Sequence, residues 1–127
     1  MDKLQQWIAL ADEDFDAAEA MLAAGKWKYA VFLCQQSLEK YLKALYIQTK
    51  NEFAPPIHNL FRLAELTGKS RFSENQLKFF SEISLYYLAS RYPEDWQKMK
   101  EIGNRAKATE VLTTTGEIRQ WLKKTLS

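Results

Sequence analysis

The chain has 127 residues, of which 46% are hydrophobic and 27% charged, a length and composition typical of one folded domain. Its 18 basic and 16 acidic residues give a formal net charge of +2, so it lacks the strongly basic balance of most nucleic-acid-binding domains, although a local basic patch is compatible with it. Four glycines and three prolines are too few for the many turns of an all-β protein.

Cysteine usage and hydropathy indicate the compartment. The lone cysteine, Cys34, excludes a disulfide framework within the chain and fits a reducing cytoplasm; we expect it to be a small buried hydrophobe. The N-terminal segment lacks the apolar core of a signal peptide, and no apolar run approaches the roughly 20 residues that span a bilayer. We therefore expect a cytoplasmic protein with no membrane segment.

The first two predicted helices differ in how much of their surface is apolar. The first, from about Asp2 to Ala24, carries a single apolar stripe and an acidic outer face that we interpret as solvated, and Gly25 is a natural stop. The second, from Tyr29 to Lys50, is apolar round well over half its circumference and should pack on several sides. Its middle is anomalous because it holds a cluster of polar residues, Gln35, Gln36, Ser37, Glu39 and Lys40.

Three more segments show helical periodicity, at about His58 to Thr67, Glu74 to about Tyr92, and Arg105 to Leu126. Ser73 and Gln76 form a capping-box pattern before the second of these, while Pro93 interrupts it and residues 94–102 predict a loop or a short helical piece. Four long helices and one short helix with brief connections predict an all-α, antiparallel up-and-down bundle, in a single domain over residues 1–127.

Motifs for metal, cofactor or nucleophilic chemistry are missing. One histidine and no paired cysteine exclude the common zinc arrangements, and the Glu-x-x-His pairs of carboxylate di-iron proteins do not occur. The sequence has no glycine-rich phosphate loop, and no nucleophile and base can be paired. We therefore predict no metal, no cofactor and no catalytic residue.

Charged residues on inward helix faces are the most informative. Arg91 ends the inward column of the fourth helix, and an inward guanidinium needs a carboxylate or an anionic ligand. Glu39, with Gln35 one turn before it, is a matching inward group on the second helix. Two interpretations stay open: a structural Glu39–Arg91 pair that sets helix register, with Ser84 or Gln35 satisfying the remaining groups, or an Arg91 that holds a phosphate or an RNA backbone.

Three other basic groups have both an ordinary and a functional interpretation. Lys40 and Lys43 suit a solvated helix edge with a weak ion pair to Glu39, or a positive flank beside the Glu39–Arg91 pair. His58 suits a capping or loop-packing role, or it closes the rim of the same centre.

Three motifs resemble those of the HEPN family. They are Gln35-Gln36-Ser37-Leu38-Glu39-Lys40-Tyr41-Leu42-Lys43-Ala44-Leu45 in the second helix, Pro56-Ile57-His58-Asn59-Leu60, and Arg91-Tyr92-Pro93. The resemblance covers nearly the whole chain in the right order. It implies an up-and-down helical bundle that is usually dimeric. Many small prokaryotic members are encoded beside a minimal nucleotidyltransferase and act with it as a toxin–antitoxin pair or a two-part enzyme.

Other members of the family are metal-independent ribonucleases that use an arginine and a histidine with four to six residues between them. Arg91 matches the arginine, but Trp96, Gln97 and Lys98 stand where the histidine is expected. This departure counts against ribonuclease activity. His58 belongs to a different motif and does not replace the missing group.

The leading hypothesis is a non-catalytic binding module that dimerises and works with a minimal nucleotidyltransferase. The resemblance and the charge pattern together predict a nucleotide or RNA site of Arg91, Tyr92, Lys40, Lys43 and His58. The alternatives are a ribonuclease toxin with a degenerate or relocated acid–base pair, and a protein-interaction subunit with no nucleotide ligand. Seven Phe, six Tyr and four Trp also exceed what one small core holds, which favours a dimer.

Overall fold

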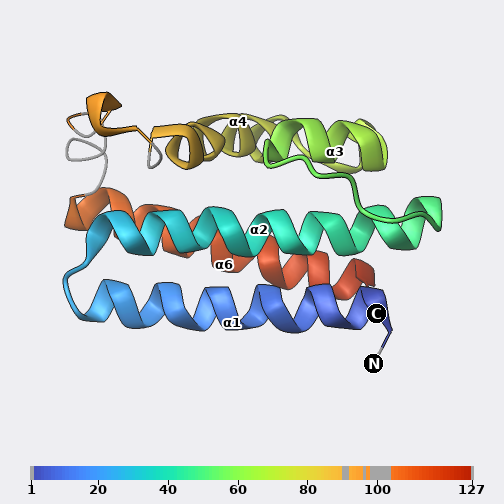
Figure 1. The fold of residues 1–127 in the computed structure, drawn as a ribbon, viewed down its shortest axis with the longest axis horizontal. Coiled ribbons are helices and arrows are strands. Elements are labelled where there is room, and N and C mark those ends of the chain that lie inside the picture. The colour runs from blue at the N-terminus through green and yellow to red at the C-terminus, as the bar shows by residue number, and fades with distance from the viewer. Residues whose placement is uncertain (1, 90–91, 96, 98–103, 127) are drawn as a thin grey trace.

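The computed structural model describes residues 2–89, 92–95, 97 and 104–126. These residues contain no strand, which confirms the predicted all-α class, and their elements are α1 (Lys3–Ala23), α2 (Trp27–Lys50), α3 (Leu60–Gly68), η1 (Lys69–Arg71), α4 (Glu74–Ala89), η2 (Pro93–Asp95) and α6 (Arg105–Leu126). The four long helices run alternately up and down, with α2 between α1 and α6 on one side and α3 and α4 on the other (Figure 1). Among the described helices, none has the length and apolarity needed to cross a membrane.

The end of α1 shows how a local signal sets a helix boundary. The Gly25 N–H donates to the carbonyl of Leu22 (3.1 Å), and the Lys26 N–H donates to that of Met21 (2.8 Å), which is a Schellman motif. Gly25 has φ = +77°, a conformation that costs little only for glycine. The predicted stop at Gly25 is confirmed, and the turn directs α2 antiparallel to α1.

Side-chain caps set the starts of α3 and α4. The capping box before α4 is confirmed, because the Gln76 N–H donates to Ser73 Oγ (3.0 Å) and the Ser73 N–H donates to Gln76 Oε1 (2.9 Å). The predicted start of the short helix at His58 is two residues early. Asn59 caps α3 by accepting from the Arg62 N–H (3.0 Å), so His58 stays in the preceding loop.

The buried arc of α4 shifts in its last turn. Phe80, Ile83 and Ser84 are buried, but Leu88, one turn after Ser84, is 55% exposed. Tyr86 is buried instead, so the packed arc extends to the Tyr86 side of the helix and away from Leu88. Tyr92, predicted as the end of this helix, lies outside α4, whose last residue is Ala89.

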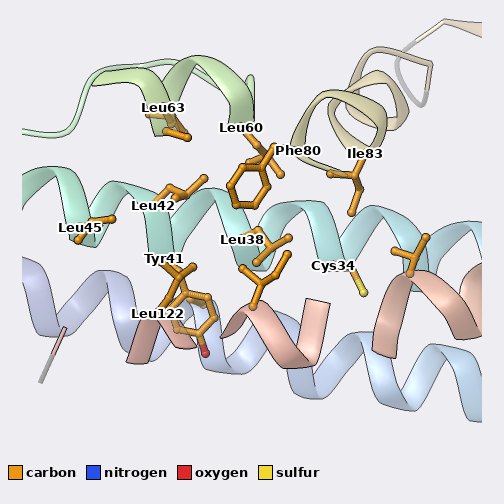
Figure 2. Close-up of a cluster of buried hydrophobic side chains, with 14 of the residues drawn as sticks. Cys34, Leu38, Tyr41, Leu42, Leu45, Leu60, Leu63, Phe80, Ile83 and Leu122 are labelled. Atoms are coloured by element: carbon orange, nitrogen blue, oxygen red, sulfur yellow. The ribbon is translucent and has the colours of Figure 1, made fainter. Parts of the chain in front are cut away.

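The core lies around α2 and confirms that this helix packs on several sides. Leu38, Leu42 and Leu45 of α2 face side chains from α3, α4 and α6 (Figure 2). Burying one such side chain contributes about 1.5–3 kcal/mol relative to leaving it in water. Cys34 lies in the same core, where burial raises the pKa of its thiol to about 12. Its role as a small buried hydrophobe is confirmed.

A polar network joins α1, α2 and α6 on the side of α2 opposite α3 and α4. Arg119 donates through Nε to the Tyr41 hydroxyl (2.7 Å) and through Nη2 to Asp12 (3.1 Å), while Tyr41 also donates to Asp12. Lys123 Nζ lies 3.2 Å from both Asp12 oxygens. The expectation that the acidic face of α1 is merely solvated is therefore wrong at Asp12, and also at Asp14, which forms an ion pair with Lys40 of α2.

This network sets the pKa of Asp12. Burial is the largest single influence and opposes ionisation, but hydrogen bonds from Tyr41 and Lys123 and the charges of Lys123 and Arg119 together outweigh it, so the pKa lies below its usual range. A carboxyl with a lowered pKa stabilises the fold above its unfolded pKa of about 3.9, and this contribution is lost as the pH falls through the folded value.

Asp12→Asn should therefore lower the melting temperature most above about pH 4, and the difference from the wild type should shrink as the pH falls further. Thermal unfolding followed by circular dichroism from pH 2 to pH 7 measures this. Asp16→Asn is the control, because Asp16 is exposed on the same helix. A difference that stays constant over the whole range would contradict the assignment.

Candidate functional site

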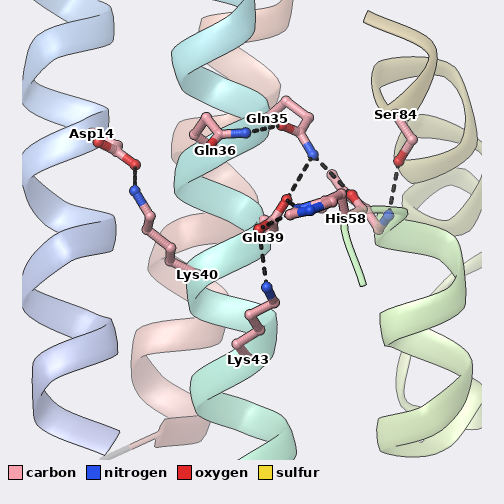
Figure 3. A network of polar contacts seen from close by, with 9 residues as sticks. Asp14, Gln35, Gln36, Glu39, Lys40, Lys43, His58 and Ser84 are labelled. Atoms are coloured by element: carbon pink, nitrogen blue, oxygen red, sulfur yellow. Dashed lines mark hydrogen bonds and ion pairs between the residues drawn. The ribbon is translucent and has the colours of Figure 1, made fainter. Parts of the chain in front are cut away.

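Glu39 is the centre of a buried polar cluster in the middle of α2. The residue is 4% exposed, and three groups surround its carboxylate (Figure 3). Gln35 Nε2 donates to Oε1 (3.3 Å), Lys43 Nζ lies 3.1 Å from Oε2, and His58 Nδ1 lies 3.1 Å from both oxygens. A buried carboxylate needs such partners because desolvation alone costs several kcal/mol.

Lys43 is buried, and the expectation that it lies on a solvated helix edge is wrong. Its side chain is only 7% exposed. The ammonium group lies 3.1 Å from Glu39 one turn earlier and 5.3 Å from the ring centroid of Trp7 on α1. The aromatic ring of the antiparallel neighbour covers the lysine, an arrangement that the pattern of α2 alone does not reveal.

His58 lies at the rim of the cluster and is held at three points. Its Nδ1 contacts Glu39, its carbonyl oxygen accepts from Gln35 Nε2 (3.0 Å), and its ring stacks on that of Tyr87, with centroids 4.5 Å apart and 23° between the planes. The imidazole is nevertheless 45% exposed. Within the described part of the chain, Nε2 has no hydrogen-bond partner.

Gln35 and Ser84, the two groups expected to complete this centre, have different roles. Gln35 bridges Glu39 and the His58 carbonyl, and its own Oε1 accepts from Gln36 Nε2 (2.7 Å). Ser84 Oγ instead accepts from the Leu60 N–H (2.8 Å). This bond joins the start of α3 to α4 and so fixes the loop that carries His58.

The structure brings only part of the predicted nucleotide or RNA site together. Lys43 and His58 both meet at Glu39, whereas the ion pair with Asp14 turns Lys40 toward α1 (Figure 3). Tyr92 is 52% exposed. Arg91, and with it the predicted Glu39–Arg91 pair, lies outside the described residues.

A row of three rings beside the cluster was not recognised in the sequence. Phe32 of α2 stacks on Tyr87 of α4, with centroids 6.4 Å apart and 12° between the planes, and Tyr87 stacks on His58. We call Phe32, Tyr87 and His58 the ring ladder. The available signals were that Phe32 shares a column with Gln35 and Glu39, and that Tyr87 lies in the inward column of its helix.

The cluster is suited to orienting an imidazole. A carboxylate on Nδ1 fixes the position of the ring and leaves Nε2 as the group that can meet a ligand. Within the described residues, no group of three or more His, Cys, Asp or Glu side chains is placed to hold a metal ion.

Comparison with known proteins agrees with the fold described above. The family model described as "HEPN domain" matches residues 4–125. The crystal structure of TT1696 from Thermus thermophilus is similar, with a TM-score of 0.81 and 22% identity over 98% of each chain. ST0689, an archaeal HEPN homologue, gives a TM-score of 0.76 and 22% identity over 100% of each chain. No curated protein matches this chain at a significant level.

Proposed function

This chain belongs to the HEPN domain family, and we propose that it is a non-catalytic, cytoplasmic module that binds a nucleotide or RNA and works with a minimal nucleotidyltransferase, as a toxin–antitoxin pair or two-component system. The observation that carries the binding role is the His58 imidazole. It is held at three points, one of them the buried Glu39, yet it is 45% exposed. Restraining a surface side chain in this way costs conformational entropy, and a ligand that needs the ring in one orientation accounts for it.

The contacts of each residue suggest different roles within the predicted nucleotide or RNA site. Lys43 is paired with Glu39, so we assign it a supporting role. Lys40 is paired with Asp14, so we place it at the edge of the site. We propose that His58 contacts the ligand directly. Arg91 and Tyr92 remain in the proposal from the sequence motif that they share.

Partner and ligand are tested together by affinity purification of the chain from its native cells. We expect a minimal nucleotidyltransferase to co-purify and a nucleotide or RNA to be released on denaturation. His58→Ala should lose the nucleotide or RNA but keep the protein partner, because His58 belongs to the ligand site. Recovery of the chain with neither would contradict the proposal.

A ribonuclease with a relocated acid–base pair is the second candidate, and the 3.1 Å contact between His58 Nδ1 and Glu39 favours it. Cleavage without metal needs both a proton acceptor for the 2′-hydroxyl and a proton donor for the leaving oxygen. Because an arginine guanidinium stays protonated, Arg91 cannot be that acceptor. We expect no cleavage of single-stranded RNA above the buffer blank in excess EDTA. Activity that both Arg91→Ala and His58→Ala abolish would establish the ribonuclease instead.

We also propose that two copies of the chain associate through the outer face of α4. Leu85 and Leu88 lie one turn apart on α4 and are 63% and 55% exposed. Two neighbouring exposed apolar side chains on one helix face are typical of an association surface.

Light scattering at micromolar concentration should therefore give twice the mass of the chain, and Leu85→Lys with Leu88→Lys should halve that value. Leu10→Lys is the control, since Leu10 is 45% exposed but lies on α1. A strictly monomeric wild type would refute the dimer.

A further inference from the structure

The ring ladder ends at the surface. Phe32 and Tyr87 are each partly buried, whereas the side chain of His58 is 45% exposed. The centroid distances of 6.4 Å and 4.5 Å, with interplanar angles of 12° and 23°, make the three rings a nearly parallel series. His58, the last ring of the series, therefore leaves a position open to solvent where a further ring can stack.

The open part of His58 follows from what covers the rest of it. Tyr87 covers one face of the imidazole and Glu39 occupies the Nδ1 edge. These two contacts leave the opposite face and the edge that carries Nε2 as the parts of the ring without a partner among the described residues. A flat face next to a hydrogen-bonding nitrogen that has no partner among the described residues is complementary to a planar heterocycle that carries polar groups on its edge.

The charges nearby favour such a ring over a phosphate as the group that meets His58. Lys43 neutralises Glu39 within the cluster, and the nearby Lys40 is paired with Asp14. The described surroundings of the imidazole are therefore close to neutral. A phosphate needs unpaired cations, whereas base stacking depends on an accessible ring face.

We infer that His58 is a stacking plate for a nucleobase, with Glu39 as the positioning residue that fixes its plane. The inference rests on the proposed nucleotide or RNA binding and names the part of the ligand that meets this surface. The base extends the ring ladder by one position, while Nε2 meets its polar edge.

Fluorescence of 2-aminopurine tests stacking itself, because this base loses emission when it stacks on another ring. The full-length chain is titrated with 2-aminopurine riboside 5′-triphosphate and, separately, with a single-stranded RNA 10-mer containing one 2-aminopurine. Equilibrium dialysis measures binding of each probe independently of the fluorescence. The two probes distinguish a free nucleotide from an RNA as the source of the base.

We expect quenching with at least one probe. His58→Ala should remove the quenching and weaken binding roughly 5- to 100-fold, the effect of losing one base–aromatic stack. His58→Phe should restore quenching because it restores a ring, whereas Glu39→Gln should reduce quenching more than it reduces binding. Phe53→Ala is the matched control, since it removes an 83% exposed ring from the same loop and should leave quenching unchanged.

Failure of the stacking plate and failure of nucleotide or RNA binding give different results in these experiments. Binding without quenching, or quenching that survives in His58→Ala, would overturn the stacking plate while leaving nucleotide or RNA binding intact. If dialysis shows that neither probe binds the wild-type chain, the proposed binding function and the stacking plate both fall. The circular dichroism spectrum of each variant must match that of the wild type, and His58→Phe keeps the comparison decisive if His58→Ala unfolds.

Discussion

Glu39→Ala should lower the free energy of unfolding by about 3–5 kcal/mol, which is the cost of breaking a buried ion pair and leaving one charge behind. The stranded charge is that of Lys43, whose side chain is 7% exposed, and the variant also removes the group that holds His58. Urea unfolding followed by circular dichroism measures the loss.

A double variant separates charge from packing at this site. Glu39→Gln with Lys43→Met removes both charges while keeping most of the volume, and we expect it to recover most of the stability lost in Glu39→Ala. Glu13→Ala is the exposed control on α1 and should change stability by no more than about 0.5 kcal/mol. A loss below about 1 kcal/mol in Glu39→Ala would mean that the cluster is open to water.

Phe80→Ala should lower the free energy of unfolding by about 3–5 kcal/mol because it opens a cavity in the core. Phe80 is fully buried, and its ring meets that of Phe72 edge to face, with centroids 5.5 Å apart. Phe72 meets Trp121 of α6 in the same manner, also at 5.5 Å. Phe80→Ala therefore removes the ring by which α4 joins the aromatic cluster that it shares with α6.

Phe80→Leu should cost less than Phe80→Ala, since leucine refills part of the space. Phe53→Ala removes the same side chain from an 83% exposed position and should change stability by no more than about 0.5 kcal/mol. Equal urea midpoints for Phe80→Ala and the wild type would show that the aromatic cluster does not form.

The site shows where sequence reasoning stops. Gln35 and Glu39 were identified because they interrupt an apolar helix, and the bond between them runs within one turn of α2. The prediction that Lys43 lies on a solvated helix edge is wrong because Trp7, which covers it, lies 36 residues away in the sequence on a different helix. Tyr87 lies on the fourth helix and His58 in a separate loop motif, and nothing in their spacing indicates that their rings stack.

The sequence by itself determined the helices and their order, because the signals for them act within one or two turns. The predicted last helix has the same bounds as α6, Arg105–Leu126, since a cap and a regular stripe need only neighbouring residues. Only the tertiary structure decided which cation pairs with Glu39, that Asp12 and Asp14 pair across helices, and that three rings form a ladder. Those contacts depend on how packed helices rotate and on the course of the loop before α3, and a periodic pattern specifies neither.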